Sequence, residues 1–331
     1  MNAGPVPLPR QVPTALSALF PPAEGYAYFE QAALCRFIRT PDYQRGTAWW
    51  CAETSLAAYL PDQEAIETLQ RGFAPLGVES VQCGSTRALG GNWFLLHCRD
   101  LKLLVFRGGG LVSTAERSRL WIEGPIQDWL FTDAAAMLSR YEHGGRVHTG
   151  FRSAYQEMRD EVRAALAVDD GDKPLWLTGH SLGGALALLT AADCHCGAVA
   201  EVEGVYVFGA PRVGNAAFMK LFAGVPLHHV VNDLDLVARV PPRHVLWLPY
   251  LDRYAEIRET RFIGRQGGVE TRGGWRSDYL DLLPGAFPAA FGQLWLGPDG
   301  WWQAAVPAMI RDHAPVLYTT HLWNDWVASL G

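Results

Sequence analysis

The sequence predicts an α/β protein with a mostly parallel central sheet and helices on both faces. Three observations support this prediction. Short apolar strands alternate with helical segments from residue 101 to 231, a pattern typical of parallel sheets. Between residues 176 and 187, an apolar strand, a Gly-x-Ser-x-Gly turn and an alanine-rich helix follow directly on one another. The chain also has 331 residues, 49% of them hydrophobic, which is enough to bury a large core.

The expected elements follow from hydrophobic spacing. Apolar residues at helical intervals predict helices over 48–60, 150–168 and 182–193. Short apolar runs predict buried strands over residues 101–106, 175–177, 205–208 and 227–231. In a parallel sheet of this kind we expect the functional groups at the carboxyl ends of the strands.

Two regions differ from this pattern. Prolines crowd residues 1–25, which predicts a flexible, extended arm, and we expect residues 26–331 to form one domain. An aromatic-rich insertion is expected at about 250–309. Within it, Phe287, Phe291 and Trp295 recur at helical spacing and predict a substrate-binding wall or a cover over the site. The alternative is that this face packs into the body of the protein. A rival cover, residues 111–127, is more typical of a solvated loop.

Charge and segment patterns argue against several classes of partner. The net charge is −6 and no basic stripe is visible, so we expect no nucleic-acid partner. Every long apolar run is broken by proline, glycine or charge, so no transmembrane segment is expected. The first 22 residues lack a basic region followed by an apolar one. We therefore expect a cytoplasmic protein, with export by a signal-independent route left open.

The six cysteines form no Cys-x-x-Cys pair. Without an export signal they are expected to be reduced thiols, most of them buried. The adjacent residues Cys194, His195 and Cys196 seldom converge on one ion, so no metal site is expected.

The Gly-x-Ser-x-Gly turn has the context of a nucleophile elbow around Ser181. Gly179 and Gly183 flank the serine because side chains there would clash across the tight turn. The following helix points its N–H groups at the place where negative charge would develop on a substrate oxygen. A serine hydroxyl also needs a base within reach, and the base needs an acid to orient it.

The chain offers several candidates for that acid and base. In α/β-hydrolases the partners follow in the chain order Ser, acid, His. Asp233 and Asp235 both follow the strand expected at 227–231. His180 adjoins the serine but is expected to point away from its hydroxyl. The histidines after the acid are His244, His313 and His321.

Seven blocks occur in order between residues 90 and 320. They cover residues 104–108, 128–133, 147–151, 179–185, 208–215, 235–242 and 312–318. Together they resemble the class 3 lipases, the fungal-lipase-like branch of the α/β-hydrolase fold.

The resemblance implies a role for individual residues. Ser181 would be the nucleophile, Asp235 rather than Asp233 the acid, and His313 the base. His321 would be structural. The oxyanion hole would be the N–H groups of Gly109 and Leu182. The family usually has Ser or Thr at the position of Gly109, so a hydroxyl that would add a second hydrogen bond is absent here. Structural roles are expected for Arg107, His148, Asp128 and Asp133.

The resemblance also implies the reaction. We expect serine ester hydrolysis through an acyl-enzyme, without cofactor or metal, on a lipid or ester substrate. Long-chain acylglycerols met at a lipid–water interface are the favoured class. A short-chain esterase, a phospholipase A1 or a polyester hydrolase would use the same triad, and an acyltransferase would need only the exclusion of water. The alternative of another class is a catalytically degenerate lipid-binding module.

Overall fold

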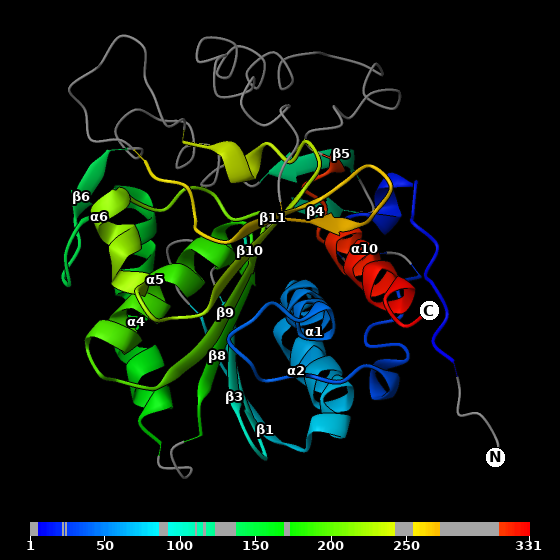
Figure 1. Ribbon diagram of the computed structural model, residues 1–331, viewed down its shortest axis with the longest axis horizontal. Helices are drawn as coiled ribbons and strands as arrows, with labels where there is room; N and C mark the ends of the chain where they lie inside the picture. Colours follow the sequence, from blue (N-terminus) through cyan, green and yellow to red (C-terminus); the bar gives the residue numbers. More distant parts are fainter. Residues whose placement is uncertain are drawn as a thin grey trace, which may run out of the picture.

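A central sheet of eight strands organises the part of the chain that the structure describes. The computed structural model describes residues 6–21, 23, 25–85, 92–109, 111–114, 117–122, 137–168, 173–241, 254–271 and 311–331. Within these residues the strand order is β1-β2-β3-β8-β9-β10-β11-β12. Helices cover both faces of this sheet (Figure 1).

Four of the seven strand pairs are parallel. The antiparallel part begins with β1 (Val78–Ser85), β2 (Asn92–Cys98) and β3 (Lys102–Phe106). The parallel part continues from β3 through β8 (Leu175–His180), β9 (Val202–Phe208), β10 (Leu227–Asn232) and β11 (Thr260–Ile263). The short β12 (Val269–Glu270) closes the order antiparallel to β11. The predicted α/β fold with a mostly parallel sheet is confirmed.

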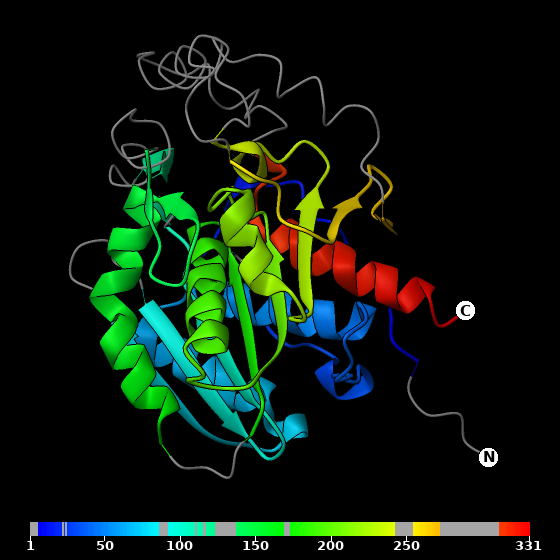
Figure 2. The same ribbon diagram turned by 60° about the vertical axis from the view of Figure 1, so that its left-hand side comes forward.

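Two layers of helices enclose the sheet. One face carries α1 (Arg45–Ala57), α2 (Asp62–Gly72) and α10 (Pro315–Ala328). The other carries α4 (Thr149–Leu166), α5 (Leu182–Cys196) and the short α6 (Ala216–Met219). Figure 2 shows the separation, with the green helices on one side and the blue and red helices on the other. Two small antiparallel pairs lie outside the sheet: β4 (Leu111–Thr114) with β5 (Arg117–Ile122), and β6 (Leu138–Arg140) with β7 (Arg146–His148).

Side-chain alternation along the strands divides the core between these two layers. In β3, Leu104 and Phe106 pack in the core beneath α4 and α5, whereas Leu103 and Val105 pack beneath α1 and α10. In β8, Leu177 takes the first side and Trp176 the second. Because both faces are covered, the central strands are buried at almost every position, and each of them contains a short apolar run.

The predicted elements are present with small shifts. The helix expected over 48–60 is α1, and the strand expected over 175–177 runs on to His180. Strands β1 and β2 are not among the predicted elements. The described part of the expected insertion, residues 254–271, supplies β11 and β12 and so extends the sheet. Strand β11 begins with the polar residues Thr260 and Arg261, so no apolar run in the sequence predicts it. Part of the rival cover, expected to be a loop, pairs as β4 and β5.

The cysteines are free thiols and most of them are buried, as the sequence predicts. All six cysteines are free, with Cys83 and Cys196 exposed and the other four buried. The described residues contain no group of three or more side chains that could hold a metal ion. Among them, no helix combines the length and the apolarity that crossing a bilayer requires.

The N-terminal arm is held against α1 and α10. The carbonyl of Leu8 accepts a hydrogen bond from Trp323 Nε1 at 2.7 Å. The guanidinium of Arg10 lies over the rings of Trp49 and Trp323, 5.3 and 4.9 Å from their centroids. Arg10 Nη1 also donates to Glu53 Oε2 at 3.1 Å. Flexibility of residues 1–25 stays a prediction, but these contacts fix residues 8 and 10 in place. We propose that residues 26–331 form one domain, a proposal supported by the continuous sheet from β1 to β12.

Glu53 is a fully buried carboxylate in the middle of α1. Its oxygens accept hydrogen bonds from the Phe29 N–H and the Tyr26 hydroxyl, both at 2.7 Å, besides the bond from Arg10. A buried charge is tolerated only when it is paired and hydrogen-bonded in this way.

Replacing Glu53 with Gln should lower the free energy of unfolding by about 3 kcal/mol, since it leaves the nearly buried Arg10 guanidinium without a counter-charge. Urea denaturation measures the change. The exposed pair Arg152–Glu142 supplies the control, because Glu142→Gln should cost less than about 1 kcal/mol. Equal losses in the two variants would contradict the prediction.

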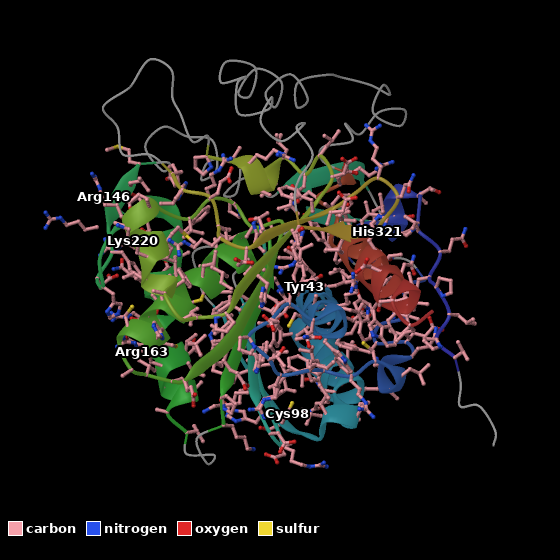
Figure 3. All side chains as sticks on the ribbon, in the orientation of Figure 1. Tyr43, Cys98, Arg146, Arg163, Lys220 and His321 are labelled. Atoms are coloured by element: carbon pink, nitrogen blue, oxygen red, sulfur yellow. The ribbon has the colours of Figure 1, made fainter. Side chains whose placement is uncertain are left out.

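A second buried cluster joins β10 to the segment before α1. His228 Nε2 donates to the carbonyl of Pro41 at 3.1 Å, and its Nδ1 accepts from Arg261 Nη1 at 3.4 Å. The rings of Tyr43, labelled in Figure 3, and Tyr206 pack against the imidazole. Burial, and then the Arg261 charge, lower the pKa of His228 from 6.5 to about 4.

Acidification from pH 7 to pH 5 should therefore destabilise the fold. In this window the unfolded chain protonates His228 and the folded chain does not, so stability falls as the pH falls. His228→Gln keeps an N–H donor near the position of Nε2 and cannot titrate. Its free energy of unfolding should drop by about 2 kcal/mol less than the parent's over this range, measured by urea denaturation at each pH. Parallel pH dependence in the two proteins would refute this.

Candidate active site

Ser181 lies at the sharp junction between β8 and α5. Its backbone angles are φ 58° and ψ −130°, a conformation that costs free energy for any residue but glycine. The Ser181 N–H donates to the carbonyl of Phe208 at 2.9 Å, which ties the turn to β9. This is the geometry of a nucleophile elbow, in which the serine hydroxyl stands clear of the backbone.

Two glycines make this junction sterically feasible. A Cβ on Gly179 would lie 2.3 Å from the carbonyl carbon and oxygen of Gly183. A Cβ on Gly183 would lie 2.1 Å from the carbonyl oxygen of Phe106 and 2.9 Å from the nitrogen of Gly108. The first turn of α5 therefore packs, backbone against backbone, on the loop that follows β3.

Asp235 and His313 form a buried pair at the same end of the sheet. His313 Nδ1 lies 2.8 Å from Asp235 Oδ2. The carboxylate also accepts from the Tyr318 hydroxyl at 2.5 Å and from the Val237 N–H at 2.8 Å. Burial alone would raise the pKa of Asp235, but the His313 imidazole and the hydrogen bonds from His313 and Tyr318 outweigh it and hold the pKa below its usual range. The ionised carboxylate can only accept, so Nδ1 of His313 donates and Nε2 is left to act as a base.

The loop after Phe208 lies against this pair. A Cβ on Gly209 would come within 2.5 Å of Asp235 Oδ2 and 3.1 Å of His313 Nδ1. Since the N–H of Ser181 is bonded to Phe208, the elbow and the Asp235–His313 pair meet at the carboxyl end of β9. Ser181 Oγ makes no hydrogen bond to the described residues. Such bonds are often long in free enzymes and shorten when substrate binds.

The other candidate acid and base lie elsewhere. Asp233 Oδ2 pairs with Arg265 Nε at 3.3 Å. His321 lies on α10 (Figure 3), and its Nδ1 would be 2.8 Å from a Cβ on Gly267. Burial, and then Arg311, lower the pKa of His321. His244 lies outside the described residues.

Gly109 and Leu182, the predicted oxyanion donors, follow the ends of neighbouring parallel strands. Phe106 of β3 is paired with Gly179 of β8. Gly109 follows shortly after Phe106, and Leu182 follows shortly after Gly179. Leu182 is the first residue of α5, where backbone N–H groups lack intrahelical partners. Their role as an oxyanion hole stays a prediction.

Arg107 and His148 have the structural roles expected of them. Arg107 donates to the carbonyls of Ala58 and Leu60 and to Asp62 Oδ1, which fixes the loop after β3 on the end of α1. His148 caps α4 by accepting from the Phe151 N–H. The predicted Phe287, Phe291, Trp295, Asp128 and Asp133 lie outside the described residues.

Sequence reasoning did not predict the contacts that Tyr59 and His180 make next to the site. The Tyr59 hydroxyl lies 2.9 Å from His180 Nδ1, and His180 Nε2 lies 2.9 Å from the backbone carbonyl of His313. The two contacts span 121 and 133 positions, and no local pattern signals them.

The chain resembles known lipases over part of its length. The family model described as Lipase (class 3) matches residues 125–245. The chain is therefore similar to the class 3 lipases over these residues. The matched residues include Ser181 and Asp235, whereas His313 lies beyond them.

Curated relatives match this chain over part of their length. A secreted mono- and diacylglycerol lipase of Malassezia globosa is 28% identical over 59% of this chain and 60% of its own. A lipase of Rhizomucor miehei is 30% identical over 46% of this chain and 48% of its own. A chloroplastic phospholipase A(1) of Arabidopsis thaliana is 40% identical over 32% of this chain and 26% of its own. The chain thus spans about half the length of the first relatives that it matches, and a quarter of the phospholipase.

The prediction of a cytoplasmic location is wrong. It depended on the composition of the first 22 residues. Several relatives, from Malassezia globosa and Malassezia restricta, are named as secreted lipases.

Replacing Gly183 with Ala should destabilise the fold by about 2 kcal/mol, because the new Cβ would overlap the Phe106 carbonyl and force the backbone apart. Urea denaturation measures the loss. Gly268→Ala is the control, since nothing lies within 4 Å of its Cβ position, and it should change stability by less than about 0.5 kcal/mol. A parent-like Gly183→Ala variant would mean that the elbow packs less closely than described.

Proposed function

We propose that this protein is a serine carboxylic-ester hydrolase that cleaves acylglycerols, with Ser181 as nucleophile, His313 as base and Asp235 as acid. The observation that carries the proposal is the 2.8 Å contact between Asp235 and His313, buried beside the Ser181 elbow. A paired acid and histidine next to a strained serine is the minimum that acyl transfer requires.

The reaction follows from the positions of these groups. His313 Nε2 takes the hydroxyl proton of Ser181 as Oγ attacks the ester carbonyl carbon, and the carbonyl oxygen becomes an oxyanion. The N–H groups of Gly109 and Leu182 would bind this oxygen. The imidazolium, stabilised by Asp235, returns the proton to the departing alcohol. Water then loses a proton to His313 and attacks the acyl-enzyme, which releases the carboxylic acid and restores Ser181.

The substrate class rests on the relatives. Two of them are named as lipases, one specifically for mono- and diacylglycerols, and this supports an acylglycerol met at a lipid–water interface. The relative named as a phospholipase A(1) supports a second candidate, cleavage of a phospholipid ester by the same triad. The relatives named as secreted support an extracellular site of action.

Gly109 bears on the rate of this reaction rather than on its type. With glycine at this position, the oxyanion would depend on backbone N–H groups alone. A missing side-chain donor in such a hole costs on the order of 3 kcal/mol of barrier. We therefore expect a slow enzyme rather than a binding module, and the contact between Asp235 and His313 beside Ser181 supports this expectation.

A direct experiment separates these functions. Parent and Ser181→Ala proteins are assayed on dioctanoylglycerol, on a phosphatidylcholine and on nitrophenyl esters of increasing chain length. A fluorophosphonate probe should label the parent at Ser181 and leave Ser181→Ala unlabelled. Hydrolysis confined to short nitrophenyl esters would replace lipase by esterase, and no hydrolysis of any ester would favour the lipid-binding module.

The two neighbouring aspartates give a matched test of the acid. Asp235→Asn should lower kcat by about 10⁴-fold with little loss of thermal stability, since an amide no longer holds the imidazole in the required tautomer. Asp233→Asn removes the same charge two residues away, next to Arg265, and should leave kcat within about threefold of the parent. The assignment of the acid fails if the Asp233 variant is the more impaired of the two.

A further inference from the structure

His180 uses both ring nitrogens beneath the site. Its Nε2 lies 2.9 Å from the His313 carbonyl oxygen, which can only accept, so Nε2 carries the proton and donates. Burial, and then the nearby His313, hold the pKa of His180 well below its usual range, so the ring is neutral. A neutral ring protonated at Nε2 has a bare lone pair at Nδ1. The Tyr59 hydroxyl, 2.9 Å away, is the donor to that lone pair.

Tyr59 also contacts the loop after β3. A Cβ on Gly108 would lie 2.0 Å from the Tyr59 hydroxyl oxygen and 2.6 Å from the carbonyl oxygen of His180. The hydroxyl therefore lies directly against the residue that precedes Gly109. Burial raises the pKa of Tyr59, so its hydroxyl keeps the proton that it donates.

These contacts connect parts of the site that are far apart in the chain. Tyr59 lies just after α1, Gly108 follows β3, His180 ends β8, and His313 precedes α10. The imidazole of His180 is not the proposed base, and it is far from His313 in the sequence. Its Nε2 nevertheless donates to the backbone carbonyl of His313. Its ring centroid is 4.5 Å from that of His313.

We propose that Tyr59 and His180 are positioning residues that hold the base His313 and the loop of Gly109 in place around Ser181. The inference rests on the proposed function. The tyrosine hydroxyl selects the Nε2–H tautomer of His180, and that tautomer fixes the His313 carbonyl. Without the Tyr59 hydroxyl, the Nδ1–H tautomer of His180 becomes accessible. In that tautomer the lone pair of Nε2 faces the His313 carbonyl oxygen and repels it. The same loss frees Gly108 to move.

The test removes one oxygen atom. Tyr59→Phe should lower kcat on nitrophenyl butyrate by about tenfold to a hundredfold, since small misplacements of catalytic groups cost this much. KM should stay within about twofold, because the substrate contacts are unchanged. The matched control is Tyr141→Phe, which loses a buried hydrogen bond to the Leu189 carbonyl at 2.7 Å, away from the site. It should lose as much thermal stability as Tyr59→Phe and keep the kcat of the parent. Equal kcat in the two variants would overturn the inference.

A second pair of variants tests His180 itself. His180→Gln places an N–H near the position of Nε2 and should keep kcat within about threefold of the parent, whereas His180→Leu should lose at least about tenfold. This comparison stands even if Tyr59→Phe does not fold. Equal loss in both variants would mean that His180 contributes packing alone, and would refute the positioning role.

The outcomes separate this inference from the proposed function. A parent protein that hydrolyses no ester in a Ser181-dependent way overturns both. An active parent with an equally active Tyr59→Phe variant overturns the positioning role and leaves the triad standing.

Discussion

The close approach of two backbones, at the start of α5 and the end of β3, is the constraint on which the rest of the site depends. Gly183 can approach the Phe106 carbonyl because it has no Cβ. This approach lets Ser181 stand on a turn with a positive φ and aligns the N-terminus of α5 with the loop that contains Gly109. The strain at Ser181 is held by the Phe208 hydrogen bond and by the covered sheet on either side.

Buried charge is compensated locally throughout this molecule. The carboxylate of Asp235 accepts from a histidine, a tyrosine and a backbone N–H, and that of Glu53 accepts from an arginine, a tyrosine and a backbone N–H. Both sets involve α10, because the Tyr318 hydroxyl donates to Asp235 and the neighbouring Thr319 Oγ1 lies 2.9 Å from the Tyr26 hydroxyl. Helix α10 is thus anchored at two buried carboxylate clusters, and its position and that of His313, which precedes it, are set together.

The features that could be predicted from the sequence are those whose residues lie close together along the chain. The elbow around Ser181 is contiguous, and the covered central strands are apolar enough to be recognised. Asp235 was separated from Asp233 by resemblance rather than by physics, since both follow the same strand. Short strand β11 carries Thr260 and Arg261 and has no apolar run to mark it. The bonds between Tyr59, His180 and His313 join three distant segments, and no periodicity or local motif reports a contact of that kind. The compartment could not be read from composition either, and there the prediction failed.

The contacts of Arg10 have a consequence for the order in which the protein is completed during synthesis. Its backbone N–H and carbonyl bond to Asn324, 314 positions later, and its guanidinium lies over Trp323. On the ribosome, α10 emerges after every other described element. The contacts of the arm with α10 therefore cannot form until α10 has been synthesised. These contacts between the N-terminal arm and α10 form late in synthesis, together with the placement of His313, which lies just before this helix.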